Sequence, residues 1–320
     1  MRSGLGVGIR DQVARRWQRI DPLLPDPPLT APSCGAELIT GRPDRRSAAG
    51  RCEHWAGAAE SLDLSWGAAR RFQLSALVAG PDVARGLDQL LSEWTAHLKE
   101  VPGSGDADTA ALVNWPSRDV DGVAALLRHG LAPLEVIAAR KTPSEPAPLG
   151  TPAQVDGLLI RRALAADIET VVRLGLEIIR FDSRFGTVGE RPGTAAALRV
   201  EATARLLTGP DAWTWLAERG GDAVGMLAAQ RPAAAGWIAP MVRSERTAYL
   251  ELMFVEPSER GAGTGAALTE TFHREVAADG VAVTLLHYEQ LNPLSVPFWH
   301  RHGYRPLWTT WEATPARAIS

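Results

Sequence analysis

The sequence contains little cysteine. Its 320 residues include two, Cys34 and Cys52, which are too few for a disulfide framework and lack the Cys-x-x-Cys spacing of redox and zinc sites. Cys52 and His54 could lie on one face of a strand, but two ligands do not make a metal site, and we assign no metal. We therefore expect two reduced thiols with an ordinary structural role.

The chain also lacks an excess of charge and a long apolar run. Its 34 basic and 37 acidic side chains are mixed and give a formal net charge of −3, so no extended field attracts nucleic acid or anionic lipid. No run of about 18 apolar residues occurs, and the opening Met1-Arg-Ser-Gly-Leu-Gly-Val-Gly lacks the apolar core of a secretory signal. We expect a cytoplasmic protein with no membrane partner.

Prolines indicate where the chain divides. Four prolines between Thr142 and Pro152 remove backbone donors and disfavour helix in the residues before them. The length is sufficient for two cores. We therefore predict a linker over 142–153 between one domain at 1–141 and a second at 154–320.

Apolar periodicity predicts alternating strands and helices after this linker. The expected strands are 158–162, 212–217, 223–228, 248–255, 282–288 and one from 307; the expected helices are 166–180, 194–207, 266–278 and 294–302. Glycines in Arg219-Gly-Gly-Asp222 favour a hairpin turn because they permit positive φ. The predicted order is β-α-α-β-β-β-α-β-α-β.

The first half repeats the end of this order. A helix is expected at 11–20, strands at 71–78, 110–115 and 135–139, and helices at 81–98 and 120–129. Arg128-His-Gly-Leu-Ala-Pro-Leu134 matches Arg301-His-Gly-Tyr-Arg-Pro-Leu307 at the same helix-to-strand junction. An internal duplication of one domain explains this match.

A glycine-rich turn follows the strand that ends at Val255. In Arg260-Gly-Ala-Gly-Thr-Gly265 the turn opens a helix, whose first N–H groups lie unpaired at the positive end of the helix dipole. Such a turn binds anions. The glycines allow close approach of a pyrophosphate, and Arg260 and the hydroxyl of Thr264 can add contacts.

This segment resembles the acetyl-CoA-binding motif of the GNAT acyltransferase superfamily, Arg/Gln-x-x-Gly-x-Gly/Ala after the fourth strand. Asn292-Pro-Leu-Ser-Val-Pro-Phe-Trp-His-Arg-His-Gly-Tyr304 is similar to the family's second signature, Asn-x-x-Ala-x-x-φ-Tyr-x-x-x-Gly-Phe, where φ is apolar. The resemblance covers roughly residues 156–315 well and the first half weakly. It implies an α/β (α+β) fold with a central mixed, mostly antiparallel sheet flanked by helices. This unit would be present twice as a pseudo-dimer, with a degenerate first copy.

The resemblance also implies a donor site for acetyl-CoA or another acyl-CoA. The strand ending at Val255 would splay from the next one near 282–286, and the pantetheine arm would lie in the opening. The residues that would bind the donor are Met253, Phe254 and Val255 through their backbone, Arg260, Gly261, Ala262, Gly263, Thr264 and Gly265 at the pyrophosphate, and Asn292 and Ser295.

Glu251 is the candidate base. Strand alternation would put Leu250, Leu252 and Phe254 on one face and Glu251 on the other, facing the cleft. Acyl transfer to an amine needs a neutral nucleophile, so a carboxylate that accepts a proton is expected. Leu250-Glu-Leu-Met-Phe-Val255 also resembles the corresponding segment of aminoglycoside 6′-N-acetyltransferases, where a glutamate binds the acceptor ammonium. The alternative is a solvated edge-strand carboxylate.

Trp299 departs from the family pattern, which often has there a tyrosine that protonates the leaving thiolate. The indole N–H cannot serve as that acid. Either solvent protonates the thiolate, or Tyr288, His287 or Tyr304 does, or the donor is not a free CoA thioester. We assign Tyr304 as the second candidate catalytic residue, and keep His300 as a weaker candidate.

Three functions stay open. The leading one is an N-acyltransferase, with acetyl-CoA as donor and a primary amine of a small molecule as acceptor. The second uses an acyl-carrier protein or an aminoacyl-tRNA as donor in a biosynthetic pathway, although the absence of a basic stripe argues against tRNA. The third is a non-catalytic module that senses acyl-CoA. In the first half Gly80 is followed by Pro-Asp-Val and no glycine-rich turn is visible, so we expect that half to shape the acceptor cleft instead.

Overall fold

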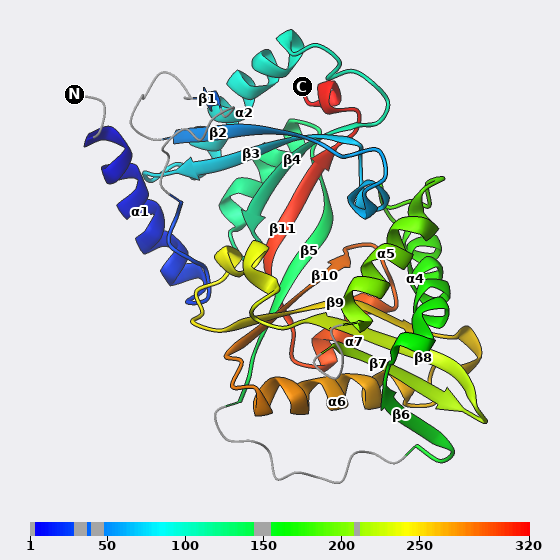
Figure 1. Ribbon diagram of the computed structural model, residues 1–320. Coiled ribbons are helices and arrows are strands. Elements are labelled where there is room, and N and C mark those ends of the chain that lie inside the picture. Colours follow the sequence, from blue (N-terminus) through cyan, green and yellow to red (C-terminus); the bar gives the residue numbers. More distant parts are fainter. Residues whose placement is uncertain (1–3, 29–36, 40–47, 144–154, 208–211) are drawn as a thin grey trace.

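The computed structural model describes residues 4–28, 37–39, 48–143, 155–207 and 212–320. Its strands form one eleven-stranded sheet in the order β1-β2-β3-β4-β11-β5-β10-β9-β8-β7-β6 (Figure 1). The strands are β1 (Glu37–Ile39), β2 (Ala48–Ala56), β3 (Arg70–Val78), β4 (Thr109–Pro116), β5 (Ala132–Lys141), β6 (Leu158–Arg162), β7 (Trp213–Arg219), β8 (Asp222–Gln230), β9 (Thr247–Val255), β10 (Val283–Glu289) and β11 (Arg305–Ala313).

The two halves of the chain exchange their last strands. β5 belongs to the first half but pairs with β10 and β11, and β11 lies between β4 and β5. Neighbouring strands are antiparallel except β3–β4 and β9–β10, which occupy equivalent places in the two halves. The predicted mixed, mostly antiparallel sheet, built twice, is therefore confirmed. The predicted linker falls mainly on 144–154, outside the described residues, and the domain boundary stays a prediction.

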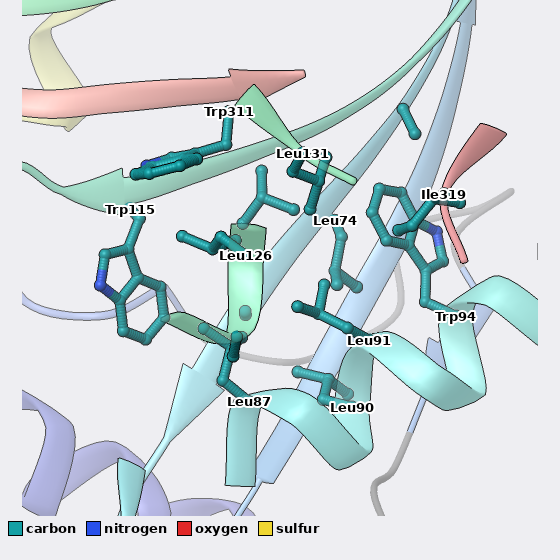
Figure 2. Close-up of a cluster of buried hydrophobic side chains, with 14 of the residues drawn as sticks. Leu74, Leu87, Leu90, Leu91, Trp94, Trp115, Leu126, Leu131, Trp311 and Ile319 are labelled. Atoms are coloured by element: carbon teal, nitrogen blue, oxygen red, sulfur yellow. The ribbon is translucent and has the colours of Figure 1, made fainter. Parts of the chain in front are cut away.

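Exchange makes each core depend on both halves. Trp311 of β11 packs among Leu74, Trp94 and Trp115 of the first half (Figure 2). In return, Val136 and Ala138 of β5 are buried in the core of the second half. Each half therefore gains buried apolar area from the other half's last strand, which stabilises the paired arrangement.

Helices cover both faces of the sheet (Figure 1). They are α1 (Gly4–Ile20), α2 (Val83–Glu100), α3 (Val123–Arg128), α4 (Ile168–Asp182), α5 (Thr194–Leu206), α6 (Thr264–Ala278) and α7 (Ser295–Arg301). In the second half α4 and α5 pack on the face that carries Leu216, and α6 and α7 pack on the face that carries Trp215. Adjacent residues of β7 thus point to opposite layers. No helix in the described part of the chain is long and apolar enough to cross a membrane.

The predicted element order of the second half is confirmed, including the hairpin between β7 and β8. Gly220 and Gly221 form its two-residue turn with φ of 61° and 93°, as a hairpin of this length requires. β1 was not predicted, and β2 was considered only as a possible strand around Cys52 and His54, because Ala48-Ala-Gly-Arg-Cys-Glu-His-Trp-Ala56 contains no β-branched residue. α1 begins at Gly4, earlier than the predicted helix at 11–20.

Candidate active site

The cleft begins where β9 and β10 stop pairing. Their parallel register runs from Thr247↔Val283 to Leu250↔Leu286 and then ends, so residues 251–255 of β9 pair only with β8. A splay is thus present, but it begins beyond Leu286 and not near 282–286, where the two strands still pair. It opens into a cavity of about 730 Å³, a size suited to a small-molecule ligand. Both halves line it, the first half through Leu62, Asp63, Trp66, Arg71 and Glu135.

Glu251 lies in a β-bulge, which corrects the expected alternation along β9. Ala228 pairs with Leu252 but Ala229 pairs with Leu250, so Glu251 is the extra residue. Leu250 therefore packs in the α6–α7 layer, while Leu252 packs in the α4–α5 layer. The prediction that Leu250, Leu252 and Phe254 share a face is wrong, because a bulge reverses the side-chain order beyond it. Glu251 still lines the cleft.

The carboxylate of Glu251 is fixed by two donors. Arg205 Nη2 lies 2.6 Å and Gln230 Nε2 3.0 Å from Oε2. Gln230 in turn accepts a hydrogen bond from Trp237 Nε1 at 2.8 Å. Both donors converge on one oxygen, and the side chain is 15% exposed. The other oxygen, Oε1, is the atom of this carboxylate that can accept a proton from a ligand.

The glycine-rich turn has the geometry of an anion site. Gly261 and Gly263 have φ of 81° and 88°, in the region that favours glycine. Gly263 caps α6, and no side chain in the described residues caps that helix end. The amides of Gly261, Ala262 and Gly263 donate no hydrogen bond within the described residues, and these three residues are exposed. Among the described residues, no protein group blocks the turn or accepts a hydrogen bond from these three amides.

Arg260 and Thr264 flank this turn differently. Arg260 Nε donates to Val255 O at 3.1 Å, and its guanidinium lies 5.0 Å from the ring centre of Phe181. Its position beside the end of β9 fits a phosphate contact. The hydroxyl of Thr264 is fully buried and has no hydrogen-bond partner in the described residues.

Asn292 and Ser295 line the cleft next to the turn. Asn292 Oδ1 accepts from the amides of Leu294 at 3.0 Å and Ser295 at 3.1 Å, so this side chain caps the start of α7. Its Nδ2 donates to Asp182 Oδ1 at 3.0 Å. The Ser295 hydroxyl is buried without a partner among the described residues. The role of Asn292 in donor binding stays a prediction, since its oxygen already serves the helix.

The structure places Tyr304 in the core. It is 2% exposed, is absent from the residues that line the cleft, and its hydroxyl lies 3.1 Å from His273 Nε2. Burial raises the pKa of Tyr304. Tyr288 of β10, named above as an alternative acid, does line the cleft, and its hydroxyl lies 3.0 Å from His300 Nε2. Burial raises the pKa of Tyr288 to about 12. Tyr304 is therefore corrected from a catalytic candidate to a core residue.

Sequence reasoning missed three carboxyl groups that meet at this end of the cleft. Asp182 comes from α4, Glu135 from β5 and Glu289 from β10. Burial raises the pKa of Asp182 to about 6. Burial, reinforced by Glu135 and Asp182, raises the pKa of Glu289 to about 9. Glu289 is thus a neutral acid at pH 7, and its Oε2 has no hydrogen-bond partner among the described residues.

Replacing Glu289 by glutamine is expected to stabilise the protein. The folded pKa of about 9 exceeds the ordinary 4.5, so between these values the folded chain holds a proton that the unfolded chain loses. Wild-type stability therefore falls as the pH rises through this window. The variant lacks this dependence, and we expect a gain on the order of 2 kcal/mol at pH 7.

Urea unfolding of both proteins at pH 5, 7 and 9 measures this difference. The stability gap should widen with pH, whereas Glu60→Gln on an exposed carboxylate should change little at any pH. Parallel pH profiles for wild type and Glu289→Gln would show that Glu289 keeps an ordinary pKa.

The equivalent site in the first half is closed. α2 begins after Asp82, whose carboxylate accepts from the amide of Arg85 at 3.0 Å and occupies the helix end. β3 and β4 stop pairing at Leu74↔Val113, and α1 packs in the core cluster that contains Leu77. The first half thus lacks a glycine-rich turn at the start of α2, and the Asp82 carboxylate at this helix end disfavours phosphate binding there.

Comparisons with known proteins agree with this geometry. Residues 210–306 match the acetyltransferase (GNAT) domain family. The chain resembles a GCN5-related N-acetyltransferase from Sphaerobacter thermophilus, at 14% identity over 90% of this chain and 83% of that one, with a TM-score of 0.58. A GCN5-related glucosamine N-acetyltransferase region of a fungal multi-domain β-N-acetylglucosaminidase gives 12% identity over 87% and 33%, with a TM-score of 0.50. No curated protein sequence matches the chain significantly.

At these identities the structural likeness establishes the fold. The chain has the GNAT fold, and the match to the acetyltransferase (GNAT) domain family covers residues 210–306 of it. The matched segment contains the splayed end of β9, the glycine-rich turn and Asn292.

Proposed function

We propose that this chain, which carries a GNAT acetyltransferase domain, transfers an acyl group from acetyl-CoA or another acyl-CoA to a primary amine of a small molecule. The observation that carries this proposal is the open turn at Gly261–Gly263. Its amides donate no hydrogen bond to the described residues, and the turn lies beside a cleft of about 730 Å³. Amides at a helix start bind phosphate oxygens.

The backbone of β9 supports the donor assignment. Residues 251–255 have no partner strand on the β10 side, which leaves the N–H and C=O groups of Met253 and the N–H of Val255 for an extended amide-containing arm; the C=O of Val255 already accepts from Arg260. A pantetheine arm supplies such amides, and its pyrophosphate would fall at the turn. The donor brings a thioester, whose carbonyl carbon is the electrophile.

Charge in the remaining part of the cleft favours a cationic acceptor. Four carboxylates, Asp63, Glu135, Glu201 and Glu251, line the cleft together with the aromatic ring of Trp237, against the guanidinium of Arg71. Burial raises the pKa of Glu201, with Glu251 as the next cause. Carboxylates in a concave site concentrate ammonium groups, and an aromatic face adds attraction for them.

Glu251 and Tyr288 can act as the base and the acid of the acyl transfer. Glu251, directly or through water, accepts one proton of the ammonium group, and the neutral nitrogen forms a C–N bond as the C–S bond of the thioester breaks. The proton that this nitrogen then loses to become an amide leaves to water and balances the proton given to sulfur. Tyr288 keeps its own proton at neutral pH because burial raises its pKa, so it can donate to the departing sulfur. His300, hydrogen-bonded to Tyr288 and exposed, connects this hydroxyl to solvent.

Tyr288→Phe is expected to lower kcat by about 10- to 100-fold, the value of a hydrogen bond to a charged group. Acetyl-CoA affinity should stay within a factor of two or so, because the donor contacts lie on β9 and the turn. Thiol release measures the rate. Tyr304→Phe, the same change in the core, should keep most of the activity; the opposite ranking of the two variants would restore Tyr304 as the acid.

A thiol-release assay over a panel of small amines with acetyl-CoA tests the function itself. The carrier-protein alternative predicts turnover only when the acyl group is attached to a carrier protein, since Trp299 replaces the usual acid in this cleft. The sensing alternative predicts binding of acyl-CoA with no thiol release for any acceptor. Release with free acetyl-CoA and an amine excludes both alternatives.

A further inference from the structure

We propose that Cys52, His54 and His97 form a site for a divalent transition-metal ion, with Zn²⁺ as the ion of best fit. One ligand atom from each side chain lies within 4.8 Å of the others. The acyl-transfer chemistry uses none of these residues, and none lines the cleft. The cluster is therefore an independent feature of the first half.

The fold brings the three side chains together from β2 and α2. Cys52 and His54 are two residues apart on β2, opposite Leu74 and Phe72 of β3, so they point to the same face. α2 packs on this face and carries His97. Cys52 is buried, His97 is half-buried and His54 is exposed. A metal bound here would have protein on one side and solvent on the other, which leaves room for a water ligand.

Neighbouring groups restrain the proposed ligands. Trp94 Nε1 donates to Cys52 Sγ at 3.2 Å, and such a bond stabilises the thiolate that a metal requires. The ring of His54 packs edge-on against Phe72 at 4.8 Å between centres, and lies 6.0 Å from the ring of His97. These contacts limit the rotation of the rings, as outer-shell groups do in metal sites.

The donor set selects the ion. A thiolate with two imidazoles suits Zn²⁺ and related transition metals, whereas Mg²⁺ and Ca²⁺ require oxygen ligands. Zn–S and Zn–N bonds of about 2.3 and 2.0 Å place one sulfur and two nitrogens roughly 3.3–3.5 Å apart in a tetrahedron. The ligand atoms lie up to 4.8 Å apart, so metal binding requires a side-chain shift of about 1 Å. The exposed His54 can make this shift.

The site would join β2 to α2 behind the cleft. On the opposite face of the same strands Trp55 stacks on Arg71, with the guanidinium 4.5 Å from the ring centre, and Arg71 lines the cleft. β2 then leads to the 3₁₀ helix Leu62–Trp66, which also lines it. The expected role of the metal is thus to hold these strands in place, and bound metal stabilises the fold.

Titration of the reduced, tag-free full-length chain with Co²⁺ tests the site by absorbance. We expect one equivalent to give a thiolate-to-cobalt charge-transfer band and the visible bands of tetrahedral Co²⁺, with Zn²⁺ abolishing both. Cys52→Ala should remove the charge-transfer band. His54→Gln, on an exposed side chain, should weaken Co²⁺ binding at least tenfold in protein whose folding without metal is verified by melting.

His129→Gln is the matched control, because this histidine lies in the same half and contacts Asp88 instead of the cluster. It should retain the full spectrum. The proposal is overturned if wild-type protein gives no charge-transfer band at stoichiometric Co²⁺, if the band survives Cys52→Ala, or if His54→Gln and His97→Gln bind Co²⁺ as tightly as wild type does.

Discussion

Replacing Gly263 by valine is expected to weaken acetyl-CoA binding at least 100-fold, or by about 3 kcal/mol. Gly263 has a φ of 88° and caps α6. A Cβ there would meet Val155 at 3.2 Å, and valine adds two methyl groups beside the exposed amides. These groups would keep the pyrophosphate from the N–H groups that are to bind it, and charge-assisted bonds of this kind are strong.

Gly221→Val is a closely matched control for backbone strain. Gly221 has a φ of 93° in the hairpin between β7 and β8, and a Cβ there meets nothing within 4 Å. Both variants pay the cost of a positive φ, but only the one at Gly263 alters the turn. Calorimetric titration with acetyl-CoA, on variants whose folding is verified by melting, compares them. Equal affinities for both would place the donor phosphates elsewhere.

Glu251→Gln is expected to lower kcat/KM for the amine by about 10²- to 10⁴-fold, the contribution of a general base. Glutamine keeps the shape and can still accept from Arg205 and Gln230, which bind Oε2 at 2.6 and 3.0 Å. It cannot accept the proton of an ammonium group. Acetyl-CoA affinity should be unchanged, so the loss separates base catalysis from donor binding.

The control for this change is Glu256→Gln. Glu256 directly follows β9 and pairs with Arg173 at 2.8 Å, outside the cleft. Its variant should retain wild-type rates. Thiol release under saturating acetyl-CoA, over a range of amine concentrations, measures both proteins. Unchanged turnover of Glu251→Gln would remove the proposed role, whereas a raised KM with unchanged kcat would limit Glu251 to binding the acceptor.

Local sequence features predicted what depends on local chemistry. Alternating apolar residues identified β6 to β11, and the glycines at 261, 263 and 265 identified the turn. The start of a helix after a strand is encoded within a few residues, so the turn at the start of α6 could be located without knowledge of the fold. The apparent duplication also has its counterpart in the two parallel strand pairs.

Features that depend on distant residues were not predictable. The local sequence does not specify that β5 pairs with β10. Apolar strands of both halves could serve as its partner, and the choice depends on packing across the whole sheet. That choice brings Glu135 beside Glu289. The bulge at Glu251 requires the register with β8. His97, distant in sequence from Cys52, joins it only through the packing of α2 on β2.

The central claim is that the amides after Arg260 bind the diphosphate of the acyl donor. Calorimetric titration of the wild-type chain with acetyl-CoA, and then with S-acetylpantetheine, which carries the arm without the diphosphate, tests it directly. The structure predicts saturable 1:1 binding of acetyl-CoA and an affinity for acetylpantetheine at least 100-fold lower. Equal affinities, or no binding of acetyl-CoA at millimolar concentration by verified folded protein, would contradict it.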